Sequence, residues 1–173
     1  MNIRIINQIL QAVAYLFFQV FIGRKLILFD VAFCFVYVGF LLSYSYDVGR
    51  VNFMFIAFAY GFVLDVFYDT LGMHTAACVL LAYLRPYLIK LLSARSNLDT
   101  DSLSEISIRE LNFSWFATYA FLLILLHHSA LFLIEAATLQ LLYLSLKKTL
   151  FSTLFTFLAV ILLQYMFFSP RRR

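Results

Sequence analysis

Long apolar runs alternate with short polar segments along the whole chain. A helix that crosses the hydrocarbon core of a membrane needs about 20 apolar residues, each adding a rise of about 1.5 Å. Runs of this kind predict membrane spans at residues 5–22, 30–46, 51–68, 73–92, 113–134 and 150–168. We expect all of them to be helical, because an open strand edge is not viable in lipid and the alternating pattern of a membrane barrel is absent. The pattern therefore predicts an all-α membrane protein with six transmembrane helices, in a single domain over residues 1–173.

The composition agrees with a chain that lives in lipid. Of the 173 residues, 64% are hydrophobic and 13% are charged, whereas a soluble domain has about 25% charged residues. With 21 Phe and 11 Tyr, the chain has more apolar surface than one water-facing core can cover. The net charge of +4 is small and the basic residues flank apolar runs, which fits membrane orientation better than nucleic-acid binding.

The basic residues also predict an orientation. The first run begins near Arg4 and passes through Ala12–Ala14, which has the A-x-A form of a signal-peptide cleavage site. Because the apolar residues continue to Ile22, we expect an uncleaved first span. If the N-terminus is cytoplasmic, most Lys and Arg residues fall on cytoplasmic segments, so the positive-inside rule favours two cytoplasmic termini. The residues that oppose this orientation are Arg24, Lys25, Lys147 and Lys148.

The first span is unusually rich in amides. Their spacing places Gln8, Gln11 and Gln19 broadly on one helical face, with Asn7 nearby. Such a face is expected to point at other helices, because amides hydrogen-bond across helix interfaces in membranes. Two interpretations stay open: ordinary contacts within the bundle, or a docking face for the span of a partner.

One long polar segment interrupts the apolar pattern between Ser93 and Leu111. It contains Ser102-Leu103-Ser104-Glu105, which has the form of a capping box and predicts a helix start. The apolar residues that follow share one edge. We therefore expect a short interfacial helix over residues 102–111 that leads into the fifth span.

A carboxylate inside the third span is the main candidate for chemistry. Asp65 lies about 15 residues into its span, and His127 and His128 lie at a similar depth in the fifth. An ionised acid in hydrocarbon needs a partner, so we expect Asp65 to pair with one of these histidines. Further out, an outward-side polar cluster is completed by Asp69, His74 and Glu135.

Three interpretations of this cluster compete: a structural tie between helices, a recognition surface for another membrane protein, and a metal or proton site. Asp65 and Asp69 are one turn apart, as a ligand pair would be, but no H-E-x-x-H or similar spacing appears. Phosphate-binding and nucleophile motifs are also absent from the sequence. Cys34 and Cys78 lie within apolar runs and are interpreted as packing residues. We expect no enzymatic activity, no cofactor and no metal.

One block of the sequence resembles a known family. The residues that carry the resemblance are Gly61, Asp65, Leu71, Gly72, His74, Ala82 and Tyr83. In this order and spacing they are similar to MreD, the small integral membrane protein of the bacterial rod-shape system. Members of that family often carry Pro-Asp at the start of the second span, whereas this chain has Phe29-Asp30.

The resemblance implies a role without catalysis. MreD-like proteins are multi-pass scaffolds of the bacterial cytoplasmic membrane that bind the single-span protein MreC. They work in the elongation complex with MreB filaments, the glycosyltransferase RodA and its class B transpeptidase, and so help couple the filaments to peptidoglycan synthesis. The family also resembles in fold the substrate-binding subunits of energy-coupling-factor transporters, which have six helices and an outward-facing pocket. The structural or partner-binding candidates are Gly61, Asp65, Asp69, Gly72, His74, Tyr83, His127 and His128.

A second function stays open at this point, namely a small-molecule-binding membrane subunit of a transporter. It requires an outward pocket with polar groups, which the histidine and aspartate cluster would supply. Subunits of that kind carry an A-x-x-x-A pattern near the N-terminus, whereas Ala12 and Ala14 are two residues apart here. Both glycines of the block, Gly61 and Gly72, are expected to allow a close backbone approach or a sharp turn.

Overall fold

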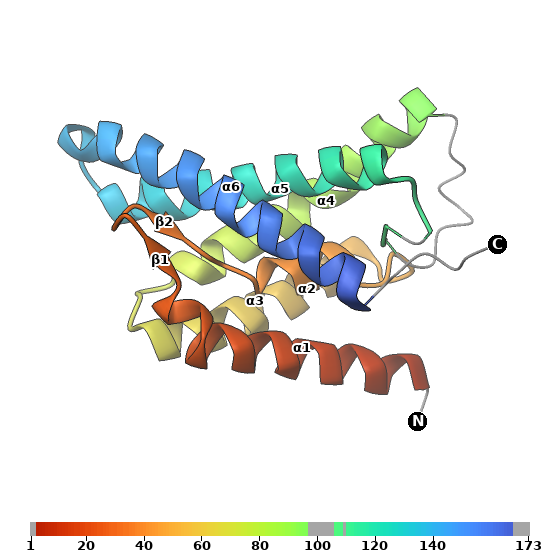
Figure 1. Ribbon diagram of the computed structural model, residues 1–173. Helices are drawn as coiled ribbons and strands as arrows, with labels where there is room; N and C mark the ends of the chain where they lie inside the picture. The colour runs from red at the N-terminus through yellow and green to blue at the C-terminus, as the bar shows by residue number, and fades with distance from the viewer. Residues whose placement is uncertain (1–2, 97–105, 109, 168–173) are drawn as a thin grey trace.

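The computed structural model describes residues 3–96, 106–108 and 110–167 (Figure 1). Within these residues, five helices are long and apolar enough to cross a membrane, which is the architecture of a multi-pass membrane protein. They are α1 (Ile3–Phe21), α3 (Arg50–Tyr68), α4 (Met73–Ser96), α5 (Phe113–Ala136) and α6 (Leu142–Phe167). They confirm the first, third, fourth, fifth and sixth predicted spans. The last helix begins earlier than the predicted residue 150.

The prediction of a helix over residues 30–46 was wrong. This segment contains a hairpin of two short strands, β1 (Ile27–Leu28) and β2 (Ala32–Phe33), then extended chain, and then the short helix α2 (Val38–Ser43). The segment is rich in Phe, Val and Tyr, which favour extended backbone over helix. Hydropathy reports only burial in an apolar environment, and the segment is indeed buried from Cys34 to Leu42.

The irregular segment still carries the chain from one end of the molecule to the other. Arg4 at the start of α1 forms an ion pair of 2.5 Å with Asp47, just before α3 begins. At the opposite end, Arg24 donates to the carbonyl of Phe67, near the end of α3, over 3.2 Å. Helices α1 and α3 therefore run in the same direction, and residues 26–49 return the chain between them. The start of α1 and the end of α6 consequently lie at the same end of the bundle (Figure 1).

Side chains from neighbouring helices satisfy the buried backbone of this return segment. Thr156 of α6 accepts from the N–H of Phe35 over 2.9 Å, and Ser152 accepts from the N–H of Phe33 over 2.9 Å. Gln19 of α1 donates to the carbonyl of Cys34 over 3.1 Å. Non-helical backbone at membrane depth is tolerated only where protein covers and satisfies it. These polar side chains of α1 and α6 therefore make the irregular crossing feasible.

Removing one of these partners is expected to weaken the fold. Thr156→Val keeps the side-chain shape but leaves the N–H of Phe35 without an acceptor, so we expect a loss of about 1–3 kcal/mol in the free energy of unfolding. Thr118→Val is the matched control, because the exposed Thr118 hydroxyl only donates to Ser114 within α5. Thermal unfolding of both purified variants in detergent checks this. Equal stability of the two would contradict the role given to Thr156.

A buried arginine satisfies the end of α2. Arg85 of α4 is 3% exposed and donates to the carbonyls of Leu42 and Tyr44 over 3.2 and 2.5 Å. It also donates to the hydroxyl of Tyr119 over 2.8 Å. A cation at a helix C-terminus is favourable because the carbonyl ends of the helix are partly negative. Arg85 thus fixes α2 against α4 and α5.

Helices α3, α4, α5 and α6 pack against one another in chain order, whereas α1 is peripheral. Gln19 is the only buried residue of α1. The predicted interfacial helix over residues 102–111 lies largely outside the described residues. Of its described part, residues 106–108 are not helical, and Ile106 and Leu111 are buried in the core.

Candidate functional site

Asp65 lies in the last turn of α3, against the first turn of α4. Its Oδ1 accepts from the backbone N–H of His74 over 2.9 Å, and its Oδ2 accepts from the N–H of Thr75 over 2.8 Å. The hydroxyls of Thr70 and Thr75 donate to the same carboxylate over 2.6 and 2.5 Å. The first N–H groups of a helix have no partner within the helix, and its N-terminus favours negative charge. Asp65 therefore caps α4 from a different helix.

This arrangement corrects the expected pairing of Asp65 with a histidine. Both carboxylate oxygens are occupied by the start of α4, and neither His127 nor His128 is a hydrogen-bond partner. The need for a partner was predicted correctly, but backbone N–H groups meet it. A sequence gives no direct sign of such a partner, because every residue carries the same backbone donor. Of the three interpretations, this contact corresponds to the structural tie between helices.

Two glycines shape the same corner, in the way that was predicted. A Cβ atom on Gly61 would lie 2.6 Å from Cα of Thr75 and 2.9 Å from its nitrogen. Gly61 thus permits a close approach of α3 and α4 that no other residue allows. Gly72 has φ +86°, in the left-handed region that favours glycine, and it makes the sharp turn before α4. Asp69 is also left-handed (φ 55°) and ends α3.

The expected placement of Asp65 and Asp69 one helical turn apart, on the same face, was wrong. Because α3 ends at Tyr68, the side chain of Asp69 is exposed rather than one helical turn beyond Asp65. In the described part of the chain, no three His, Cys, Asp or Glu residues are grouped closely enough to hold a metal ion. Glu135 forms an ion pair of 2.8 Å with Lys148 and is not in contact with Asp65.

Three histidines lie close to one another inside the bundle, but a tyrosine organises them. The hydroxyl of Tyr37, in the return segment, lies 2.8 Å from Nδ1 of His74 and 2.9 Å from Nε2 of His127. His128 bonds instead to the carbonyl of Ile124 over 2.7 Å. All three rings are buried. Tyr37 therefore links the return segment to α4 and α5. This role could not be predicted, because a tyrosine in an apolar run is typical of packing.

Tyr83 lies apart from this cluster. The residue is 42% exposed on α4, and its ring centroid lies 5.6 Å from that of Tyr87. The guanidinium of Arg50 lies over both rings, at 5.6 and 4.5 Å. The structure therefore separates Tyr83 from the other candidate residues of the block.

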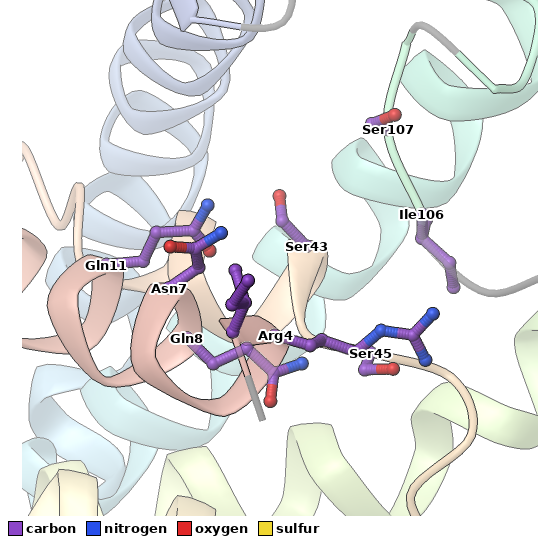
Figure 2. A pocket seen from close by; sticks show the side chains of 9 residues that line it. Arg4, Asn7, Gln8, Gln11, Ser43, Ser45, Ile106 and Ser107 are labelled. Atoms are coloured by element: carbon purple, nitrogen blue, oxygen red, sulfur yellow. The ribbon is translucent and has the colours of Figure 1, made fainter. Parts of the chain in front are cut away.

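A polar cavity opens beside the first turns of α1 (Figure 2). It has a volume of about 360 Å³, and α1 contributes Asn7, Gln8 and Gln11 to its wall. The residues that complete the lining are Ile3, Arg4, Ser43, Ser45, Ile106 and Ser107. None of the three amide side chains hydrogen-bonds to another described residue, whereas Gln19 is fully engaged in the bundle. The amides of α1 thus serve two purposes: Gln19 holds the return segment, and the others face an open cavity.

An apolar groove of about 420 Å³ continues from this cavity along α1 toward α6. Gln11 lines both spaces. The other groove residues are Leu10, Ala14, Tyr15, Phe18, Val36 and Leu163. Together the two spaces form what we call the α1 groove, polar near the start of α1 and apolar beyond it.

Comparison with protein-family models, curated proteins and solved structures gives no match to this chain. The expected likeness to the subunits of energy-coupling-factor transporters therefore has no support from a solved structure.

Proposed function

We propose that this protein is a non-enzymatic membrane scaffold of the MreD kind, and that the α1 groove holds the single transmembrane helix of an MreC-like partner. The observation that carries the proposal is the set of three amides, Asn7, Gln8 and Gln11, without hydrogen-bond partners in the described part of the chain. Interhelical hydrogen bonds stabilise helix association in membranes. Arg4 is already paired with Asp47, so the polar end of the groove suits uncharged polar groups of a partner helix.

The residues of the MreD-like block have structural roles that fit a scaffold. Gly61, Asp65 and Gly72 fix the corner between α3 and α4, and His74 joins this corner to Tyr37 of the return segment. Rigid packing of these elements leaves the peripheral α1 as the helix with the most open side. In this proposal the protein lies in the bacterial cytoplasmic membrane with both termini cytoplasmic. Its further partners are RodA, the class B transpeptidase and MreB.

Site-specific crosslinking tests the location of the partner. A photoreactive residue at Gln11 or Ala14, which line the groove, is expected to crosslink to the span of a co-expressed MreC-like protein. The same residue at Val13 or Phe17 is the control, because these side chains are exposed on α1 but do not line the groove. Crosslinks from the control positions alone would exclude the groove as the docking surface.

Co-purification tests the contribution of the amides. Gln11→Leu removes one interhelical hydrogen-bonding group worth about 1 kcal/mol, so we expect about fivefold weaker retention of the partner. Unchanged retention by a triple variant in which Asn7, Gln8 and Gln11 are all leucine would contradict the proposal. Thermal unfolding of the variants without the partner separates a binding defect from a folding defect.

A further inference from the structure

A second cavity opens at the end of the molecule opposite the polar cavity, beside the β1–β2 hairpin. Its volume is about 260 Å³, and its lining is mostly aromatic and aliphatic. Small-molecule sites are typically apolar cavities with a few polar groups that fix the orientation of the ligand. The lining residues that matter here are Phe33, Phe35, Phe132, Arg24, His74 and Glu135.

His74 directs a polar atom into this cavity. The residue is 2% exposed, and its ring is held edge-on against Phe35, with centroids 5.5 Å apart. The ring of Tyr68 is tilted against it, with centroids 5.0 Å apart. Nδ1 is engaged by the Tyr37 hydroxyl, so the opposite edge of the ring, with Nε2, is left for the cavity. Among the described residues, Nε2 has no hydrogen-bond partner.

The neighbouring contacts indicate that this nitrogen carries a proton. The Tyr37 hydroxyl lies between Nδ1 of His74 and Nε2 of His127 and can donate only one hydrogen. Nδ1 of His127 is buried without a partner. The arrangement that leaves neither an N–H nor the Tyr37 O–H buried without an acceptor runs from His127 Nε2–H to Tyr37, and from the Tyr37 O–H to His74 Nδ1. Nε2 of His74 is then an N–H donor that faces the cavity.

The mouth of the cavity carries positive charge. Lys148 is neutralised by Glu135 at 2.8 Å. Arg24 is exposed, and no carboxylate in the described part of the chain pairs with it. Its guanidinium donates to the carbonyl of Phe67 and lies 5.4 Å from the centroid of the Tyr68 ring. Arg24 is therefore held at the rim with donors left for an anion.

We propose that this cavity binds a small aromatic carboxylate. The flat ring would lie among Phe33, Phe35 and Phe132, because offset and edge-to-face contacts between aromatic rings are favourable. The carboxylate would accept from Arg24 and from Nε2–H of His74, and both hydrogen bonds are charge-assisted because the acceptor is ionised. This site is independent of the scaffold role proposed for the α1 groove, because the cavity and the groove share no lining residue.

Binding can be tested with 4-fluorobenzoate as the probe and 4-fluorobenzamide as its uncharged match. We expect saturable broadening of the fluorine NMR signal of the acid with protein in nanodiscs, reversed by excess benzoate and absent with empty nanodiscs. Arg24→Gln is expected to weaken binding about tenfold, because a hydrogen bond to a charged group is lost. Lys25→Gln is the control, since Lys25 is the adjacent basic residue and does not line the cavity.

Each outcome of the binding experiment either supports the proposed site or overturns it. Loss of binding in Arg24→Gln but not in Lys25→Gln supports the site. Equal binding of the amide and the acid, equal binding by the Arg24→Gln variant, or no saturable binding at millimolar probe would each overturn the proposal. Crosslinking along α1 is unaffected by any of these outcomes, so failure here leaves the scaffold proposal standing.

Discussion

Replacing Asp65 with alanine is expected to lower the free energy of unfolding by about 3 kcal/mol, among the largest effects of a single substitution in this protein. The carboxylate accepts four hydrogen bonds, two of them from N–H groups at the start of α4. Hydrogen bonds to a charged group contribute about 1.5–3 kcal/mol each, and a buried donor left unpaired costs about 1–3 kcal/mol. These contributions are not additive, because the start of α4 can relax.

Asp65→Asn and Asp69→Asn make a matched pair for this test. The amide at position 65 keeps one acceptor oxygen but loses the charge, so we expect a loss of stability between those of the wild type and the alanine variant. The side chain of Asp69 is exposed, and asparagine tolerates its left-handed backbone, so Asp69→Asn is expected to stay within about 0.5 kcal/mol of the wild type. Thermal and SDS-induced unfolding measure the difference. Indistinguishable unfolding of the two asparagine variants would show that Asp65 does not hold α4.

Apolar length and composition were enough to predict the five long helices, because a membrane span can be recognised by the hydropathy of its sequence. The same signal predicted a helix over residues 30–46 and was wrong there. Hydropathy reports that a segment is buried, but it does not report which groups satisfy its backbone. Thr156, Ser152 and Gln19 supply those groups from distant parts of the chain, so only the three-dimensional packing reveals them.

The candidate site was predicted only in part, because its contacts also depend on groups from distant parts of the chain. A buried acid needs partners, and the sequence indicated that Asp65 was such an acid. The histidines at a matching depth were the natural partners by residue type, yet the start of α4 lies nearer to the carboxylate. Tyr37 and Arg85 were missed because each interacts with residues far away in the chain, at His74, His127 and the end of α2.

Buried backbone groups of the return segment depend on side chains from neighbouring helices. The return segment and the short helix α2 expose many backbone groups inside an apolar bundle, and side chains from α1, α4, α5 and α6 satisfy them. The corner between α3 and α4 must hold its position for His74 to reach Tyr37, because that contact joins the corner to the return segment. The geometry of the corner therefore affects both the core and the cavity beside His74. At Gly61 the two helices of the corner leave no room for a Cβ atom.

Gly61→Ala is expected to lower the free energy of unfolding by about 1–3 kcal/mol, the usual range for overpacking. The new Cβ would lie 2.6 Å from Cα of Thr75, so α3 and α4 must separate. Separation would also lengthen the hydrogen bonds from α4 to Asp65, and Gly61→Val is expected to cost more than alanine. Gly49→Ala is the control, because nothing lies within 4 Å of its Cβ position and its φ of −54° suits alanine. If Gly61→Ala unfolds at the same temperature as Gly49→Ala, the close approach of α3 and α4 does not limit stability. In that case the role of Asp65 must be judged from its own variants alone.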